Sequence, residues 1–334
     1  MRLPRRELRP LLVALVLLAP ACASRTDRAP APPGAAEPSP ASPTAPAGSA
    51  GCRAPDAAAY ARAGTVQLRS LTVDGTERTY RLYLPAVASP SVPAPLVLNF
   101  HGLGSSAAEQ EAYSGLVPVA AREGFVLVSP DGEGQPRRWG VPVLPSEESL
   151  QPDLRFVDAL VAELEDRLCL DPGRIYATGL SNGAFFSSVL GCLRPEAFAA
   201  VAPVAGVYFP RVGCRGQVPL LAVHGRLDQV VPYDAGLIFG LIPYAGAEAY
   251  AEAWARQNGC EARPERRSIA PHVTETSWPG CAADTRLLTI EDGGHTWPGS
   301  IDVPRLGPTN HEITAADVIW AFFARQERRP PAPR

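Results

Sequence analysis

The sequence predicts an α/β fold, with a mostly parallel central sheet covered by helices on both faces. Three observations predict it: short, continuous apolar runs typical of strands buried on both faces, helical patterns between these runs, and a serine between glycines where a strand leads directly into a helix. The 334 residues suffice for one large domain or two small ones, and 46% of them are hydrophobic, which is ordinary for a protein with a sizeable core.

The first half of the chain supplies buried strands and two helical stretches. The apolar runs 96–100 and 125–128 predict the strands, and residues 107–123 between them carry a helical pattern. Residues 79–84 alternate polar and apolar side chains, as expected of a half-buried edge strand. A clearer helix is predicted over residues 153–168, because one face of it would carry Phe156, Leu160, Leu164 and Leu168.

The second half continues this alternation of strands and helices. A β-branched and aromatic stretch predicts a strand over residues 174–178, and a helix begins soon after Ser181. Further strands are predicted over residues 199–204, 220–223 and 286–290, and further helices over residues 247–257 and 315–325. The last helix is expected to bury Val318, Ile319, Phe322 and Phe323.

The turn Gly179-Leu180-Ser181-Asn182-Gly183 is the most informative motif. A serine on so tight a turn needs small neighbours, and its hydroxyl stands at the carboxyl edge of the sheet, as in the nucleophile elbow of α/β-hydrolases. The Gly-x-Ser-x-Gly pattern alone is weak, but its position between a strand and a helix strengthens it. We therefore expect the α/β-hydrolase fold, with Ser181 as the nucleophile.

An acid and a base are expected after later strands, because the order along the chain in this fold is serine, acid, histidine. Asp228 follows the strand 220–223, and His295 follows the strand 286–290. Asp228 would orient His295, which would take the proton of Ser181 and later deliver it to the leaving alcohol.

Other residues compete for these two roles. Asp234 is the nearest rival for the acid, and Asp228 could instead serve only as a turn or capping residue. His101 precedes the serine, which is the wrong order for the base, and His224 is expected to pack or form a hydrogen bond near the acid loop. The two remaining histidines, which follow no predicted strand, are His272 and His311.

Two backbone N–H groups are expected to form an oxyanion hole, which binds the negative charge that develops on the substrate oxygen. One belongs to Asn182, directly after the nucleophile, and the other to Leu103, in the loop after the strand 96–100. Glycines on both sides of Leu103 would let this backbone approach the substrate, and a plain glycine turn is the alternative.

Composition excludes several classes of protein. The chain contains no lysine, which excludes Schiff-base enzymes, pyridoxal-phosphate enzymes and P-loop nucleotide binding. A net charge of −3, with no basic run beyond the N-terminus, argues against a nucleic-acid partner. No Cys-x-x-Cys pair or His-Glu-x-x-His motif is present, so no metal site is expected, and a serine nucleophile with an acid and a base needs no organic cofactor.

The N-terminus has the pattern of an export signal. Within residues 1–21, four arginines precede an apolar stretch, 11–19, that is too short to span a bilayer. The sequence Ala19-Pro20-Ala21-Cys22 permits ordinary signal-peptidase cleavage or, although Pro20 is unusual there, a bacterial lipoprotein box in which Cys22 is lipidated. We expect the second, and therefore a cell-envelope lipoprotein held to the membrane only by its lipid; a monomer is expected as well. The first would make the protein freely secreted.

Residues 22–51 are rich in Ala and Pro and predict a disordered tether, ahead of a catalytic domain over 52–327 and a disordered tail over 328–334. Lipidation of Cys22 would leave an even number of cysteines, six, in an oxidising compartment, where they allow fifteen pairings. The pairing that we favour is Cys52–Cys169, Cys192–Cys214 and Cys260–Cys281.

Five sequence blocks, in this order, carry a resemblance to a known family. They are Asn99-Phe100-His101-Gly102; Pro130-Asp131-Gly132 followed by Trp139; the turn around Ser181; His224-Gly225 with Asp228 and Pro232-Tyr233; and Gly294-His295-Thr296-Trp297-Pro298-Gly299. Over residues 60–325 the chain resembles the polyhydroxybutyrate depolymerase-like esterases, which include bacterial feruloyl esterases and lipoprotein esterases. The resemblance implies that the matching Ser181, Asp228 and His295 form the triad.

The expected activity is hydrolysis of a short or aromatic acyl ester through an acyl-enzyme, with feruloyl esters first and 3-hydroxybutyrate oligomers second. The candidates for an aromatic substrate pocket are Trp139, Trp297 and Phe185, together with His101, although tryptophans near a sheet edge also pack in cores and Phe185 is expected to be a core residue. Two features depart from the family pattern: Ala184-Phe185-Phe186 after the elbow, and the lack of a polymer-binding module, which argues against attack on solid polyester. The alternatives from other classes are a binding lipoprotein with an inactive hydrolase fold and a peptidase.

Overall fold

A computed structural model describes residues 48–141 and 150–328 of the chain. The chain separates into two units, residues 1–44 and residues 45–334, and every described residue belongs to the second. The predicted signal peptide, Cys22, most of the tether and the chain after Arg328 lie outside the described residues. Within the described ranges, no helix is both long enough and apolar enough to cross a membrane.

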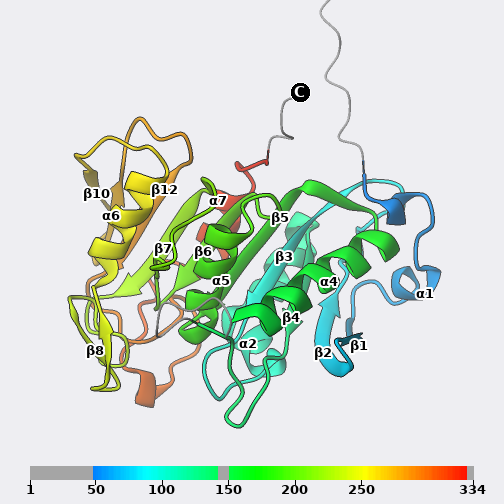
Figure 1. Ribbon diagram of the computed structural model, residues 1–334, viewed down its shortest axis with the longest axis horizontal. Helices are drawn as coiled ribbons and strands as arrows, with labels where there is room; N and C mark the ends of the chain where they lie inside the picture. The colour runs from blue at the N-terminus through cyan, green and yellow to red at the C-terminus, as the bar shows by residue number, and fades with distance from the viewer. Residues whose placement is uncertain (1–47, 142–149, 329–334) are drawn as a thin grey trace, which may run out of the picture. The chain divides into compact units, whose positions relative to one another are not determined.

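A ten-stranded sheet runs through the described unit (Figure 1). Its six central strands are parallel, and antiparallel strands extend it at both ends. In spatial order the strands are β1 (Val66–Val73), β2 (Thr76–Tyr83), β4 (Val126–Pro130), β3 (Ala94–Phe100), β5 (Leu170–Leu180), β6 (Ala200–Val204), β7 (Leu220–Gly225), β12 (Thr285–Ile290), β11 (Val273–Ser277) and β10 (Glu265–Ala270). The mostly parallel sheet that the sequence predicts is therefore present.

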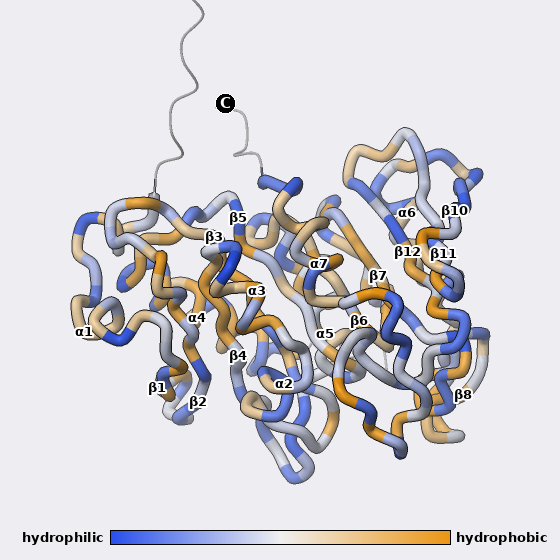
Figure 2. The backbone as a smooth tube through the Cα atoms, turned by 180° about the vertical axis from the view of Figure 1, so that it is seen from behind, coloured by the Kyte–Doolittle hydropathy of each residue, from blue (hydrophilic) through white to orange (hydrophobic). Residues whose placement is uncertain are grey.

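Helices cover both faces of this sheet, as the two opposite views in Figures 1 and 2 show. The larger core cluster takes most of its helical side chains from α4 (Gln151–Arg167), α5 (Asn182–Leu193) and α6 (Ala247–Gln257). The second cluster, on the other face, takes them from α3 (Leu116–Glu123) and α7 (Ala315–Phe323). The remaining helical segments are α1 (Ala57–Tyr60), α2 (Ala107–Ser114) and the short 3₁₀ turns η1 (Ala50–Cys52) and η3 (Pro304–Leu306).

The closing helix α7 buries the side chains expected from its sequence. Ile319, Phe322 and Phe323 belong to the second core cluster, and Val318 packs against that cluster while remaining half-buried.

Strand β3 shows why the sequence of a parallel strand is one continuous apolar run. Leu96 and Leu98 join the larger cluster on one face, and Val97 joins the second cluster on the other.

One helix predicted from the sequence is in fact two. Residues 107–123 form α2 and α3, which are separated by Gly115 in a left-handed conformation, with a φ of 65°. Glycine adopts this conformation without the strain that a side chain would cause, and it ends α2 there. Both helices still lie within the predicted range.

Of the four antiparallel strands at the two ends of the sheet, β1, β10 and β11 are absent from the prediction, and only β2 was expected. Residues 79–84 were expected to form an edge strand, but β1 pairs with the outer side of β2 and takes the edge position. The turn Asp74-Gly75, in which both residues have positive φ, is a local hairpin signal that could have revealed β1. Strand β10 is largely exposed, so it lacks the apolar run by which buried strands are recognised, and the small hairpin of β8 (Gly236–Ile238) and β9 (Ile242–Tyr244) has strands of only three residues.

The folded unit is slightly longer at both ends than the predicted range 52–327. The buried Ser49 hydroxyl donates a hydrogen bond of 2.7 Å to the carbonyl of Leu168 and accepts one of 3.0 Å from the N–H of Leu170. At the other end, the N–H of Arg328 donates to the carbonyl of Gly173 at 2.8 Å. Residues 48–51 and Arg328 therefore belong to the domain, and the tether and tail predictions are wrong for them.

Three disulfides join distant parts of this unit. They are Cys52–Cys169, Cys192–Cys214 and Cys260–Cys281, which are the three pairs favoured from the sequence. The first links segments 117 residues apart, and the other two close loops of 22 and 21 residues. Sequence spacing could not distinguish among fifteen pairings, and it is the fold that brings these cysteines together.

Candidate active site

The predicted catalytic segments all follow parallel strands at one edge of the sheet. Strands β3, β5, β7 and β12 run in the same direction, so their carboxyl ends lie at the same edge (Figure 1). The residues that follow these four strands are, in the same order, Leu103, Ser181, Asp228 and His295. In open α/β sheets this edge is where ligands bind.

Ser181 lies on a tight turn between β5 and α5, with a φ of 57° and a ψ of −117°. A positive φ is uncommon for a residue with a side chain, and such strain persists only where the surroundings impose it. The N–H of Ser181 donates to the carbonyl of Val204 on β6 at 3.0 Å, which holds the turn against the sheet. A Cβ atom at Gly183 would lie 2.2 Å from the carbonyl oxygen of Phe100, so only glycine fits there. These features are those of a nucleophile elbow.

Asp228 and His295 form a buried hydrogen-bonded pair. The Nδ1 of His295 lies 2.7 Å from Oδ2 of Asp228, and Oδ1 of Asp228 accepts hydrogen bonds of 2.8 Å from the N–H groups of Val230 and Val231. Burial alone would raise the pKa of Asp228, but hydrogen bonds from His224 and His295 outweigh it and lower the pKa to about 2. Asp228 is therefore a carboxylate that accepts a hydrogen bond from Nδ1–H of His295, which leaves Nε2 of the neutral imidazole as the nitrogen that can accept a proton.

The other aspartate and histidine candidates do not form the acid–base pair. Asp234, the rival acid, is exposed. Nε2 of His224 lies 2.9 Å from the carbonyl oxygen of Val231 and 3.4 Å from Oδ2 of Asp228, so His224 supports the acid loop as expected. The exposed His272 and His311 pair with the surface carboxylates of Glu312 and Asp302.

The loop after β3 lies beside the elbow. A Cβ atom at Gly102 would stand 3.5 Å from Cβ of Ser181, which is ordinary contact distance. Asn182 is the first residue of α5, so its N–H has no acceptor within the helix. Leu103 is 45% exposed on the neighbouring loop. The two backbones predicted to supply oxyanion donors are therefore both next to Ser181.

The predicted aromatic pocket is wrong in this structure. His101, Trp139 and Trp297 are each at most 1% exposed, so none of them presents a surface to a substrate. The Trp139 ring stacks on Phe186 with a centroid distance of 5.2 Å, and Trp297 belongs to the core cluster beneath α7. Packing, the alternative left open by the sequence, explains both tryptophans.

Both ring nitrogens of His101 are also occupied. Nε2 accepts a hydrogen bond of 2.9 Å from the N–H of Gly132, so Nδ1 carries the proton and donates to the carbonyl of Gly102 at 2.7 Å. Burial lowers the pKa of His101, in keeping with this neutral form. His101 therefore fixes the loop that precedes Leu103 and is not a pocket residue.

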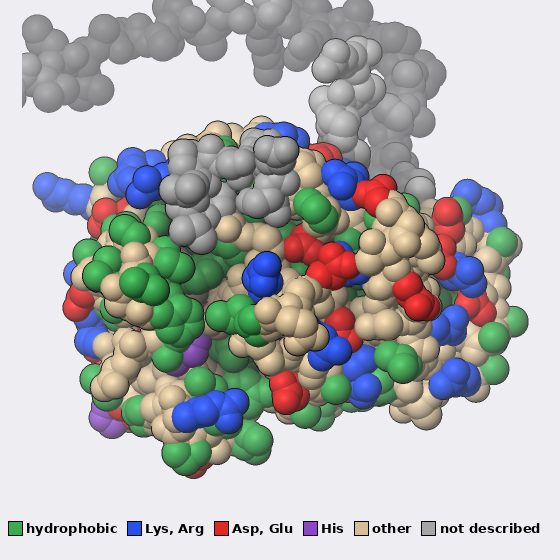
Figure 3. All heavy atoms as spheres, turned by 60° about the horizontal axis from the view of Figure 1, so that its bottom comes forward, with side chains coloured by type: hydrophobic (Ala, Val, Ile, Leu, Met, Phe, Trp, Pro, Cys, Tyr) green, Lys and Arg blue, Asp and Glu red, His purple; other side chains and the backbone are tan. Residues whose placement is uncertain are grey.

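Apolar side chains are exposed on the loops at the same edge. Figure 3 brings the lower edge of Figure 1 forward and shows hydrophobic side chains gathered on part of this face. Of the large hydrophobic residues exposed in the described ranges, those that follow β3, β7 and β12 are Leu103, Leu227, Leu237, Phe239, Leu241 and Ile301.

Two curated relatives show which family this is. No family model matches the chain. The putative esterase NocK of Nocardia uniformis subsp. tsuyamanensis is 34% identical over 291 residues, which cover 78% of this chain and 83% of NocK. The probable feruloyl esterase C of Aspergillus flavus is 29% identical over 258 residues, which cover 74% of this chain and 84% of that protein. The chain belongs to this feruloyl esterase-like family. It is a carboxylic ester hydrolase, and the family resemblance noted from its motifs is confirmed.

A solved structure identifies the fold of the esterase. The acetyl xylan esterase from Aspergillus awamori superposes with a TM-score of 0.57 at 15% identity, covering 78% of this chain and 99% of that one. At this level of identity the likeness concerns the fold alone. The α/β-hydrolase fold predicted from the elbow is confirmed.

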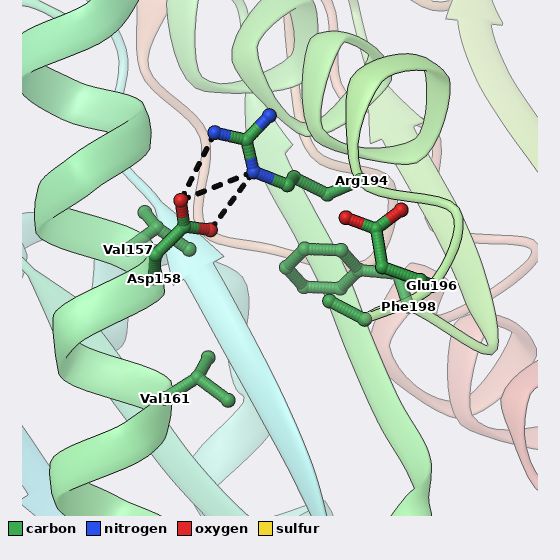
Figure 4. Close-up of a pocket in the computed structure, with 7 residues that line it drawn as sticks. Val157, Asp158, Val161, Arg194, Glu196 and Phe198 are labelled. Carbon is green, nitrogen blue, oxygen red and sulfur yellow. Dashed lines mark hydrogen bonds and ion pairs between the residues drawn. The ribbon is translucent and has the colours of Figure 1, made fainter. Parts of the chain in front are cut away.

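A hollow elsewhere on the esterase does not belong to this site. It has a volume of about 280 Å³ and is lined by Val157, Asp158, Val161, Arg194, Glu196, Ala197 and Phe198 (Figure 4). Arg194 follows the last residue of α5, whereas Ser181 precedes the first, and a helix of 12 residues is about 18 Å long. Asp158 and Arg194 close one side of the hollow by an ion pair of 2.9 Å. Within the described ranges, no group of three or more His, Cys, Asp or Glu side chains could hold a metal ion.

The side chain of Asn182 has a contact that sequence patterns could not reveal. It forms hydrogen bonds with the backbone of Trp139, which lies 43 residues earlier in the chain. Trp139 stood out in the sequence only as an aromatic residue after the Pro130-Asp131-Gly132 block. A pairing of this kind leaves no periodic or spacing signal in the sequence.

Proposed function

We propose that the esterase hydrolyses its substrate through a triad of Ser181, His295 and Asp228. The observation that carries this proposal is the 2.7 Å hydrogen bond between Asp228 and Nδ1 of His295, at the same sheet edge as the strained Ser181 turn. The buried carboxylate fixes the tautomer of His295 and stabilises the imidazolium that forms during the reaction. Three residues in these roles are what acyl transfer to a serine requires.

The reaction proceeds in two halves. Oγ of Ser181 attacks the ester carbonyl while Nε2 of His295 takes its proton, and the N–H groups of Asn182 and Leu103 bind the resulting oxyanion. His295 then returns the proton to the leaving alcohol, which gives an acyl-enzyme. Water attacks that acyl group with His295 again as base, the acid departs, and the proton returns to Ser181.

The proposed substrates are feruloyl esters or other short or aromatic acyl esters. Two observations support this choice: the relationship to a probable feruloyl esterase, and the exposed apolar side chains of Leu103 and Leu227 on the loops that carry the proposed oxyanion donor and acid. Because Trp139 and Trp297 are buried, an aromatic acyl group would contact these aliphatic side chains instead of stacking on indoles. Oligomers of 3-hydroxybutyrate are the second candidate, since the exposed side chains of Leu103 and Leu227 can also contact an aliphatic acyl group.

We also propose that the esterase is an exported monomer. Three disulfides support export, because they persist in oxidising compartments. A basic and apolar N-terminus followed by Cys22 supports a lipid anchor in the cell envelope. Incorporation of radiolabelled palmitate into the wild-type protein, and no incorporation into a Cys22→Ala variant, would establish the anchor.

The triad and the substrate are tested together by comparing kcat/KM for methyl ferulate with kcat/KM for p-nitrophenyl butyrate. We expect Ser181→Ala to lower both values by at least about 1,000-fold. Ser187→Ala is the matched control, because Ser187 is buried on α5 and its hydroxyl bonds only the carbonyl of Ala184 in the described structure. Full activity in Ser181→Ala would refute the mechanism.

The ratio of the two values identifies the acyl group. A higher kcat/KM for methyl ferulate supports a feruloyl esterase, and a higher value for the butyrate ester moves the assignment to aliphatic esters such as hydroxybutyrate oligomers. Absence of hydrolysis in the oxidised wild-type protein, for both esters, would favour the binding lipoprotein instead.

A further inference from the structure

The loop after β4 reaches across the sheet to the nucleophile elbow. In the sheet, β4 is separated from β5 by β3, yet Trp139, which lies in the loop after β4, contacts Asn182 at the start of α5. The N–H of Trp139 donates to Oδ1 of Asn182 at 2.7 Å, and Nδ2 of Asn182 donates to the carbonyl of Trp139 at 3.1 Å. The side-chain amide of Asn182 thus pairs with both the N–H and the carbonyl of Trp139. This two-point contact fixes the orientation of the Asn182 amide against the Trp139 backbone.

The same loop is bonded to the segment that carries Leu103. Nε1 of Trp139 donates to the carbonyl of His101 at 3.1 Å, and the N–H of Gly132 donates to Nε2 of His101 at 2.9 Å. The N–H of Gly104 donates to the carbonyl of Arg137 at 2.8 Å. Hydrogen bonds therefore join the loop after β4 to residues on both sides of Leu103.

Packing makes this loop rigid where it crosses. The Trp139 ring is 1% exposed, stacks on Phe186 and meets Phe100 edge-on at a centroid distance of 5.0 Å. Phe186 lies one helical turn after Asn182, so the ring and the backbone of Trp139 both hold the first turn of α5. Gly132 is required at its position because a Cβ atom there would lie 2.5 Å from the carbonyl oxygen of Arg138.

We propose that the Asn182 side chain is a positioning residue, which with Trp139 sets the distance between the two oxyanion donors. This inference rests on the proposed function, in which the N–H groups of Asn182 and Leu103 bind the oxyanion. The two donors belong to separate segments of the chain, and the Asn182–Trp139 pair ties the elbow by hydrogen bonds to the loop after β4, which is bonded in turn to the Leu103 loop. Oxyanion donors accelerate acyl transfer only when they are held where the charge develops.

The chain offers a matched control in Asn258. Its side chain makes the same two-point contact with a backbone residue, accepting from the N–H of Val218 at 3.2 Å and donating to its carbonyl at 2.9 Å. Asn258 is fully buried, but Val218 precedes β7, at the opposite edge of the sheet from Ser181. Asn182→Ala and Asn258→Ala thus each remove a two-point contact of this kind, at opposite ends of the parallel strands, and Asn258→Ala also removes a hydrogen bond of 2.9 Å to the Thr285 hydroxyl.

The experiment measures kcat and KM for p-nitrophenyl butyrate, inhibition by phenylboronic acid, and the melting temperature of each variant. Phenylboronic acid accepts an electron pair from Oγ of Ser181 as the serine proton passes to His295, and the anionic tetrahedral adduct depends on the oxyanion donors. For Asn182→Ala we expect kcat to fall about 10- to 100-fold, phenylboronic acid to bind more weakly by a similar factor, and KM to stay within about twofold. For Asn258→Ala we expect a lower melting temperature with kcat and boronate affinity unchanged.

Trp139→Phe supplies a second, milder test that keeps an aromatic ring and the backbone contact with Asn182 but removes the Nε1 hydrogen bond to the carbonyl of His101. We expect a smaller loss of kcat, about 3- to 10-fold, again without a matching change in KM. If Asn182→Ala does not fold, Trp139→Phe still tests the link from Trp139 to the Leu103 loop, and unchanged kcat in it would overturn the proposed role of that link. Unchanged kcat in the folded Asn182→Ala protein, or an equal loss in Asn258→Ala, would overturn the proposal. Activity that persists in Ser181→Ala would instead overturn the proposed mechanism itself, so the two failures are distinguishable.

Discussion

At the scale of single residues, Asp228 is the side chain whose chemistry depends most on the fold. Its side chain has no exposed surface, one carboxylate oxygen accepts two backbone N–H groups, and the other faces His295 and His224. These donors are available only in the folded protein. They favour the charged form more strongly than burial disfavours it, which lowers the pKa from its ordinary value near 3.8 to about 2.

A depressed pKa makes stability depend on pH in a defined window. The stabilisation from the Asp228 carboxylate is fully present above pH 4 and is lost as the pH falls through about 2, because the unfolded chain takes up the proton first. We expect the wild-type free energy of unfolding to fall by about 2 kcal/mol more than that of Asp228→Asn between pH 5 and pH 2. Urea unfolding at a series of pH values measures this. The exposed Asp234→Asn should keep the wild-type slope, and equal slopes in wild type and Asp228→Asn would contradict the expectation.

At the scale of elements, the three disulfides stabilise very different lengths of chain. Cys52–Cys169 joins η1 to the segment just before β5 across 117 residues, whereas Cys260–Cys281 closes a loop of 21 residues after α6. In the chain-entropy account, a cross-link stabilises the folded state by restricting the unfolded one, and the effect grows with the logarithm of loop length. The long cross-link is therefore the more important of the two.

The expected difference is measurable. Replacing both cysteines of Cys52–Cys169 by serine should lower the free energy of unfolding by about 5 kcal/mol, and the same replacement at Cys260–Cys281 by about 3 kcal/mol. Guanidinium unfolding under oxidising conditions measures both losses, with the intact protein as reference. A smaller loss for the long cross-link than for the short one would show that the loop-length account does not apply here.

At the scale of the whole described unit, the sheet ends in two open edges, β1 and β10. An open edge invites pairing with another chain unless its side chains prevent it. Strand β10 exposes Glu265, Arg266 and Arg267 in succession, and β1 carries Arg69. Charges in these positions favour the proposed monomer, because pairing with another chain would strip them of water.

Removing the charges from β10 should therefore promote association. We expect the double variant Arg266→Val and Arg267→Val to form dimers or larger assemblies as its concentration rises, as measured by sedimentation velocity. Arg256→Val is the control, because Arg256 is equally cationic and its side chain is 72% exposed, but it lies on helix α6 and not on a strand edge. A double variant that sediments as the control does would mean that these charges do not protect the edge.

Local patterns predicted most of the central sheet and its helices. The apolar runs at β3, β4, β6, β7 and β12 and the range of α6 all appear in the sequence, since burial on both faces of a parallel sheet requires continuous apolar residues. The same reasoning failed at β1 and β10, where strands are polar or exposed and no such requirement acts. Chain order together with strand ends was enough to select Ser181, Asp228 and His295 as candidates.

The sequence by itself thus determined the alternation of strands and helices, the elbow at Ser181 and the family to which the chain belongs, because each of these is carried by short local patterns or by the order of such patterns along the chain. Only the tertiary structure decided that Trp139 and Trp297 are packing residues and that Asp228, and not the exposed Asp234, is the carboxylate beside His295. The contact between Asn182 and Trp139 was likewise decided by the fold. Burial and hydrogen bonding between residues 43 or 67 positions apart depend on how strands are ordered in the sheet, and no local pattern in the sequence specifies that order.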